Sequence, residues 1–191
     1  MPVSSNVRRP KLQLHHLMHF SFQLSFTSQI DFLQHWASKY HDPNEMKYLP
    51  NVGKKLSSES LHQLFEWKNG SGISRRKLHS IAANYPLVFE GDPANRYLNH
   101  NNPGGAIWNI FYLHCLDPKK WPIFDQHTFR AMHYLRNGQI REIGSTNKLK
   151  YFMYQFEYIP FLKEFSEPSQ RRIDMALFTF GKFLKLAKGY A

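Results

Sequence analysis

The chain has 191 residues, 42% of them hydrophobic and 16% aromatic, which is enough to bury a core in one domain or in a compact pair of lobes. Its formal net charge of +11 favours a polyanionic partner, nucleic acid before an anionic membrane surface, over a basic surface that only aids solubility. A single cysteine, Cys115, excludes an internal disulfide, and we expect neither a secretory signal nor a membrane span, which favours a cytoplasmic, nucleoid-associated protein.

Helix-length segments with apolar faces follow one another along the chain, separated by turns rich in Pro, Gly and Asn. We expect helices over residues 28–40, 58–68, 74–84, 104–116, 125–135, 146–165 and 169–188. Pro160 should kink or break the helix over 146–165. Only residues 12–26 show the alternation of a strand, and they fit an extended arm equally well.

This pattern predicts an all-α fold in a single domain over residues 1–191. Its expected parts are an N-terminal arm over 1–27 and two lobes at roughly 28–135 and 146–191. A cleft between the lobes would be the natural place for a ligand.

The turn Asn102-Pro103-Gly104-Gly105 precedes an apolar helix and is a candidate phosphate-binding loop. Two glycines let backbone N–H groups approach a phosphate closely, and the following helix adds the positive end of its dipole. The competing interpretation is an ordinary helix start, with Pro near the first helical position and the glycines supplying the turn.

Asp125 is the candidate catalytic acid, because it precedes the helical pattern of Phe129, Met132 and Leu135. A carboxylate at the positive end of a helix dipole stays ionised and can stabilise a cation. His127 is expected to face the same site or a phosphate, or else to be satisfied by solvent or backbone. Arg130 follows one turn later and is either a DNA contact or the partner of Asp125 in a structural ion pair.

The segments NPGG, AIWNIFYLHCL, DPKKW and PIFDQHTFRAM, between Leu98 and Leu135, resemble the helix-hairpin-helix DNA glycosylase superfamily. The resemblance implies a two-lobed helical bundle in which Asp125 is the essential acid. In that role its carboxylate stabilises the oxocarbenium character of the deoxyribose as the N-glycosidic bond breaks, and helps to position or deprotonate a water molecule.

The chain departs from this superfamily in its hairpin and at the position of the catalytic lysine. The hairpin HNNPGGA lacks the usual spacing, and Ala106 stands where bifunctional members carry the lysine nucleophile. We therefore expect hydrolysis that leaves an abasic site. No cofactor is expected, because the chain lacks the four cysteines of the iron–sulfur subclass, and its eleven histidines lack metal-site spacing.

A flipped base needs aromatic and hydrogen-bonding groups to hold it. The candidates are Trp67, Lys68 and Asn69, which end the second predicted helix and are expected to be exposed, and Trp108 in the helix after the hairpin. For any single aromatic residue at helical spacing, packing in the core is the competing interpretation.

Together these features predict a monomeric, monofunctional DNA N-glycosylase that flips and excises a damaged or modified base from single- or double-stranded DNA. Repair and defence against phage DNA with modified bases would use the same chemistry. The alternative is a non-catalytic DNA- or RNA-binding helical module in which Asp125 only caps its helix. A third class is a protein-interaction partner that uses its aromatic surface.

Overall fold

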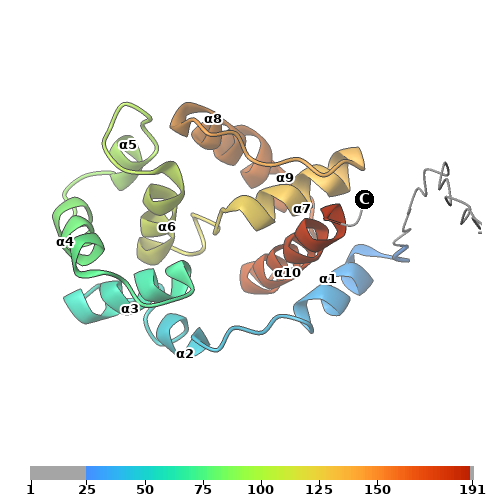
Figure 1. Ribbon diagram of the computed structural model, residues 1–191, viewed down its shortest axis with the longest axis horizontal. Helices are drawn as coiled ribbons and strands as arrows, with labels where there is room; N and C mark the ends of the chain where they lie inside the picture. The colour runs from blue at the N-terminus through green and yellow to red at the C-terminus, as the bar shows by residue number, and fades with distance from the viewer. Residues whose placement is uncertain (1–24, 190–191) are drawn as a thin grey trace, which may run out of the picture.

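The computed structural model describes residues 25–189, and within that range the chain is helical with no strand, which confirms the predicted all-α fold (Figure 1). The first helices are α1 (Gln29–Ala37), α2 (Glu45–Tyr48), α3 (Ser58–Asn69), α4 (Arg75–Asn84), α5 (Pro93–Tyr97) and α6 (Ala106–Leu116). They are followed by α7 (Gln126–Asn137), α8 (Asn147–Phe152), the π-helical η1 (Met153–Tyr158), α9 (Ile159–Leu162) and α10 (Gln170–Lys188). All but the last three residues of the predicted arm lie outside the described residues.

Side-chain caps explain where most of these helices begin. The N-cap side chain accepts a hydrogen bond from a backbone N–H of the first turn, which would otherwise be unsatisfied. The residues that do this are Ser28, Ser57, Ser74, Asp92, Asp125, Thr146 and Ser169. Of these caps, Asp125 also lines the cavity described below.

The helices pack around two hydrophobic cores. One lies among α2 to α6 and includes Leu64, Phe65 and Phe111, and the buried Cys115 belongs to it as a free thiol. The other lies among α1, α7, η1, α9 and α10 and includes Phe124 and Phe180. In Figure 1 the first group occupies the left end of the molecule and the second group the right end.

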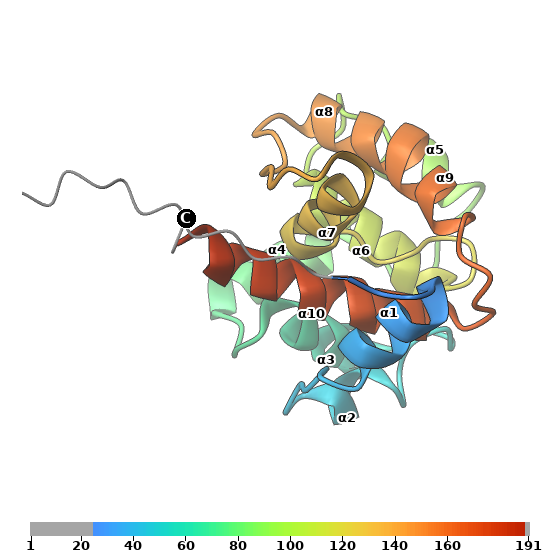
Figure 2. The same cartoon turned by 90° about the vertical axis from the view of Figure 1, so that its right-hand side faces the viewer.

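The division into lobes differs from the one expected from the sequence. The prediction placed α1 and α7 with the N-terminal lobe over 28–135, but both helices pack against α10 (Figure 2). Phe32 and Trp36 of α1 contact Phe180 of α10 through edge and tilted ring pairs at 5.3 and 5.0 Å. The first and last described helices therefore belong to the same lobe, and the apolar periodicity of each helix does not reveal which partner helix it meets.

Residues 147–162 form one continuous helical stretch, so Pro160 does not interrupt the helix. A π-helical segment precedes α9, and Pro160 lies at the start of α9, where its missing N–H is tolerated. Tyr154 and Tyr158 of the π segment are fully buried against Phe124, and Tyr154 Oη donates to the carbonyl of Pro122 at 3.1 Å. The π turn thus packs directly beneath the segment that leads to Asp125.

Two short helices, α2 and α5, were not predicted. They have four and five residues, fewer than the two turns over which apolar periodicity can be recognised. Each buries one tyrosine, Tyr48 or Tyr97, in the core of the first lobe.

The crossing of α7 and α10 fixes the geometry at the start of α7. At Gly181 of α10 a Cβ atom would lie 2.0 Å from the carbonyl oxygen of His127, so the two backbones meet without a side chain between them. Arg130 strengthens this contact, because its guanidinium donates to the carbonyl of Gly181 at 2.8 Å. The first turn of α7 is therefore held against the middle of α10.

Candidate active site

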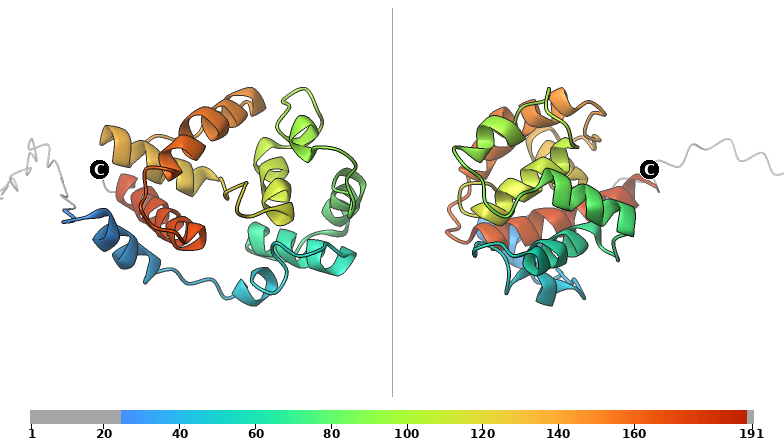
Figure 3. Two further views of the ribbon diagram at one scale, coloured as in Figure 1. Left: turned by 180° about the vertical axis from the view of Figure 1, so that it is seen from behind. Right: turned by 90° about the vertical axis from the view of Figure 1, so that its left-hand side faces the viewer.

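Asp125 is located where the segment between α6 and α7 crosses from one lobe to the other (Figure 3). Its Oδ1 accepts hydrogen bonds from the backbone N–H groups of His127 and Thr128 at 2.8 and 3.0 Å. Thr128 Oγ1 in turn accepts from the N–H of Asp125 at 2.9 Å, which completes a capping box. The predicted placement of Asp125 at the start of a helix is confirmed.

Lys68, at the end of α3, pairs with the other carboxylate oxygen of Asp125. Its Nζ lies 2.8 Å from Oδ2, and the side chains are 8% and 15% exposed. Burial raises the pKa of Asp125, but the Lys68 ammonium and the backbone N–H of Thr128 outweigh it and hold the pKa below its ordinary value. Asp125 is therefore an ionised carboxylate at neutral pH. Lys68 was predicted to contact DNA, and no pattern in the sequence indicated that it would meet an acid 57 residues away.

Arg130 does not form the ion pair with Asp125 that was the main competing explanation of both residues. Its guanidinium pairs with Glu142 at 2.7 Å and is 2% exposed. This burial also corrects the expectation that Arg130 contacts DNA, since the side chain holds α7 to α10 and to the loop that carries Glu142.

His127 is half-buried beside Asp125. Its ring packs edge-on against Phe178 at 5.1 Å, and its Nδ1 lies 3.1 Å from a guanidinium nitrogen of Arg130. Burial lowers the pKa of His127 despite the neighbouring carboxylate of Asp125, so the imidazole is neutral at physiological pH. As a neutral ring that lines the cavity, it can hydrogen-bond a ligand but does not neutralise a phosphate.

A cavity of about 490 Å³ opens in front of Asp125. Its walls come from the end of α3, the first turn of α6, the first turn of α7, the N-terminal half of α10 and Lys150 of α8. The volume lies in the range of small-molecule sites. Both lobes contribute to this cavity, which agrees with the expectation of a site between them.

The residues predicted to hold a base are brought to this cavity, but Trp67 and Lys68 are much less exposed than expected. Trp67, Asn69 and Trp108 all line it together with Lys68. Trp67, however, is only 7% exposed and stacks on Tyr48 at 4.2 Å, so it packs in the core where an exposed residue was expected. Trp108 remains half-buried between the ring of Phe65 and the ammonium of Lys77, which lies 4.0 Å from its ring centre.

The hairpin loop is held by contacts with the segments around it. Gly104 has φ of +106°, and a Cβ there would lie 2.6 Å from Asn109 Oδ1, which explains the glycine. The side chain of Asn102 donates to the carbonyl of Arg96, and the N–H of Ala106 donates to Asn147 Oδ1 at 3.1 Å. Asn102, Gly104 and Gly105 do not line the cavity, so their contact with phosphate stays a prediction.

Helix α10 contributes a face of the cavity that the sequence did not indicate. Arg171, Asp174 and Phe178 lie three and four residues apart and therefore share one side of the helix. Arg171 joins this face to the first lobe, because its guanidinium pairs with both Asp174 and Glu45 and lies over the ring of Tyr48 at 4.5 Å. An Arg and an Asp on an otherwise apolar helix face were the available signal.

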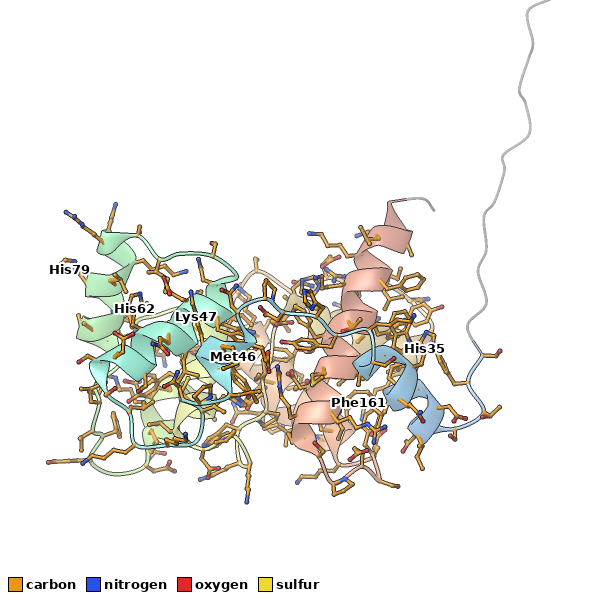
Figure 4. All side chains as sticks on the ribbon, turned by 90° about the horizontal axis from the view of Figure 1, so that it is seen from below. His35, Met46, Lys47, His62, His79 and Phe161 are labelled. Carbon is orange, nitrogen blue, oxygen red and sulfur yellow. The ribbon has the colours of Figure 1, made fainter. Side chains whose placement is uncertain are left out.

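The histidines of the described helices do not gather into a metal site. In Figure 4, His79 on α4 and His35 on α1 lie at opposite ends of the molecule, and His62 on α3 lies near the Lys47–Glu66 ion pair. Over residues 25–189 no group of three or more His, Cys, Asp or Glu side chains is arranged to bind a metal ion.

Comparisons of this chain with models of protein families, with curated proteins and with solved structures find no match. Within the described residues, every helix is too short or too polar to cross a bilayer. The assignment of a function therefore depends on the chemistry of the cavity and on the resemblance of residues 98–135 to the glycosylase superfamily.

Proposed function

We propose that this protein is a monofunctional DNA N-glycosylase that excises a damaged or modified base by Asp125-assisted hydrolysis. The observation that carries the proposal is the ionised Asp125 carboxylate, which is held at the start of α7 and faces a cavity with aromatic and cationic walls. A cytoplasmic, nucleoid-associated location fits such a substrate.

The chemistry follows from the charge of Asp125. As the bond between C1′ and the base nitrogen breaks, positive charge develops on the deoxyribose ring, and a fixed carboxylate stabilises it. Water then adds to C1′ and gives up a proton, which leaves an abasic site. Because two backbone N–H groups and Lys68 already orient the carboxylate, little reorganisation accompanies the developing charge.

Hydrolysis is favoured over attack by an amine. Ala106 takes the position of the lysine in bifunctional superfamily members. Lys68 is near, but it is paired with Asp125 as an ammonium, and an ammonium has no free electron pair with which to attack C1′.

The surroundings of the cavity suit a flipped nucleotide. Trp108 and Phe178 line the cavity with aromatic rings against which a base can pack. Lys150 lines the cavity, Lys77 contacts Trp108 and Asn69, and Lys182 lies over Phe178, so three cationic side chains are available to phosphates at or next to the cavity wall. Base excision repair and excision of modified bases from phage DNA both fit this arrangement.

A non-catalytic nucleic-acid-binding module is the second candidate, and one observation favours it. Asp125 has a complete structural role, because it caps α7 through a capping box and forms an ion pair with Lys68. Under this alternative the same cavity and charges bind nucleic acid without cleaving the glycosidic bond.

Replacement of Asp125 by Asn separates the two candidates. Asn keeps the shape and the cap of α7 but removes the negative charge. The purified protein is incubated with oligonucleotides that carry different damaged or modified bases, and alkali then reveals abasic sites. We expect Asp125→Asn to lower the excision rate by a factor on the order of 100 or more while DNA binding is retained.

The matched control is Asp117→Asn. Asp117 also accepts hydrogen bonds from two backbone N–H groups, those of Lys119 and Lys120, but it lies outside the cavity. The Asp117→Asn protein should excise the base at the wild-type rate. Binding without excision by the wild-type protein on every substrate would support the non-catalytic module.

A further inference from the structure

Asp174 is a second carboxylate in the cavity that Asp125-assisted hydrolysis does not use. It lies on α10, its side chain is 8% exposed, and it lines the same cavity as Asp125. One oxygen, Oδ2, pairs with Arg171. The other, Oδ1, is buried and has no hydrogen-bond partner among residues 25–189. A buried acceptor without a partner is costly, so a position that retains one invites a functional explanation.

Asp174 is not needed to hold Arg171 in place. Arg171 already pairs with Glu45 at 2.7 Å and donates to Tyr40 Oη at 2.9 Å, and both contacts tie α10 to the first lobe. Oδ1 of Asp174 adds nothing to this link. Its position instead gives the cavity a second acid beside Asp125.

The charged and titratable groups around Asp174 come from α10 itself, from the cap of α7, and from α2, α3 and η1. Burial raises the pKa of Asp174 to about 6, Arg171 lowers it, the negative charge of Asp125 raises it and Lys68 lowers it. Tyr48 of α2 and Tyr158 of η1 also face it, and burial keeps both phenols protonated. At mildly acidic pH Asp174 thus carries a proton while Asp125 is ionised, which is the division of labour that an acid and a charge-stabilising carboxylate need.

We propose that Asp174 is the general acid that protonates the departing base. The inference rests on the proposed glycosylase function. In the step, the C1′–N bond breaks and its electron pair stays with the base, while the proton on Asp174 moves to a ring nitrogen or exocyclic oxygen of that base. Water adds to C1′ and loses a proton to solvent through the Asp125 side, so the products are a neutral base and an abasic sugar, and Asp174 regains its proton from solvent.

This role specifies a class of substrate. An uncharged modified base is a poor leaving group, because it departs as an anion unless a proton is delivered to it. A base that is already cationic through ring alkylation departs as a neutral molecule and gains little from an acid. The geometry therefore points to neutral modified bases as the substrates that depend on Asp174.

The test compares two leaving groups in wild-type and Asp174→Asn protein. Duplexes that contain 8-oxoguanine or hypoxanthine supply neutral bases, and a duplex that contains 7-methylguanine supplies a cationic one. Single-turnover rates are measured from pH 4.5 to 8 with enzyme in excess, and spontaneous loss of 7-methylguanine is subtracted. Asn preserves the shape of the side chain and can still donate a hydrogen bond, but it has no proton to transfer.

We expect wild-type excision of a neutral base to fall about tenfold per pH unit above pH 6. Asp174→Asn should lower that rate on the order of 100-fold at pH 5.5 and flatten the pH profile, while release of 7-methylguanine changes less than about threefold. Asp92→Asn is the matched control, because Asp92 caps α5 through the N–H of Ala94 outside the cavity and Asn keeps that cap.

The other outcomes overturn the inference in recognisable ways. An equal loss with neutral and cationic bases would assign Asp174 a structural role, and no loss would remove it from the reaction. Two results with the wild-type protein would refute the general acid and still support the glycosylase proposal. One is release of 7-methylguanine but of neither neutral base. The other is release of a neutral base at a rate that does not fall above pH 6. If the wild-type protein binds these duplexes but releases none of the bases, the glycosylase proposal itself fails for them, and the inference falls with it.

Discussion

Asp125 and Asp174 show how two residues of one type acquire different properties within one cavity. Asp125 has an ammonium and two backbone N–H groups on its carboxylate, and these hold its pKa below the ordinary value even though burial opposes them. Asp174 shares its one cation, Arg171, with Glu45 and leaves an oxygen unpartnered, so burial prevails and its pKa rises to about 6. Hydrogen bonding and charge pairing, rather than residue type, set the two protonation states.

Replacement of Lys68 by Gln tests whether its ammonium sets the charge of Asp125. Because the folded pKa of Asp125 is depressed, its ionisation stabilises the protein above the unfolded pKa of about 4, and this contribution is lost as the pH falls through the folded pKa. We expect Lys68→Gln to reduce the free energy of unfolding by about 1–3 kcal/mol at pH 7, and by less at pH 3. Urea unfolding at the two pH values measures this difference.

The same substitution should move the activity profile. Without the ammonium, the pKa of Asp125 rises, so the pH below which excision is lost should move upward. Lys47→Gln is the control, since it removes an ion pair with Glu66 that lies outside the cavity. If Lys68→Gln loses the same stability at both pH values, Lys68 stabilises the protein through packing. The backbone N–H groups at the start of α7 would then be what keeps Asp125 ionised.

At the scale of elements, the crossing of α7 and α10 joins the cap at Asp125 to the face of Asp174. Gly181 allows this contact, because a Cβ there would overlap the carbonyl of His127, which is backbone and cannot rotate away. Displacement of α10 would separate the two carboxylates as well as open the core around Phe180.

Gly181→Ala should therefore reduce both stability and excision. A methyl group at 2.0 Å from a backbone oxygen forces the helices apart, and we expect a loss of about 2–3 kcal/mol in unfolding free energy, at the upper end of overpacked sites. Thermal melting followed by circular dichroism measures it. In Gly72→Ala, where the nearest atom is a flexible Glu66 oxygen at 3.9 Å, the melting temperature should stay near that of the wild type. Equal melting temperatures for the two variants would contradict the close packing of α7 on α10.

The sequence predicted the long helices well because their starts and faces are local properties. Ser57, Asp125 and Ser169 each mark a helix start by a cap that depends on the next three residues only. The pairing of α1 with α10 could not be predicted, since an apolar face at Trp36 fits any complementary helix. The π segment over 153–158 was missed for the same reason, because burial of Tyr154 and Tyr158 against Phe124 stabilises it and local propensity does not.

The candidate site was predictable where it is local and missed where it is assembled. Asp125 and Trp108 fall within a continuous stretch whose pattern resembles a known superfamily. Lys68 and Asp174 reach the cavity from α3 and α10, and only the packing of these helices places them beside Asp125. Neither expectation for Arg130, a DNA contact or an ion pair with Asp125, anticipated Glu142, because this partner comes from a loop that periodicity does not describe.

At the scale of the whole molecule, part of the net charge of +11 is concentrated near the cavity. Lys150 on α8 lines the cavity, while Lys77 on α4 and Lys182 on α10 contact the rings of Trp108 and Phe178 in its wall. This arrangement favours a polyanion that approaches the cavity over one that binds elsewhere on the surface.

The double substitution of Lys77 and Lys150 by Gln tests whether the lysines near the cavity contact DNA phosphates. The measurement is the salt dependence of DNA binding. Each phosphate contact of a lysine releases about one counterion, so the slope of log affinity against log salt concentration should become less steep by about 0.9 per residue for duplex DNA. The control is the double substitution of Lys39 and Lys163, which are exposed on α1 and α9 ends outside the cavity and carry the same charge change. Fluorescence anisotropy with one labelled duplex over a salt series measures both slopes. If the slope changes by the same amount in both double variants, DNA binds to the basic surface in general and not at the cavity. Asp125 would then have no access to a DNA substrate, which would contradict the proposed function.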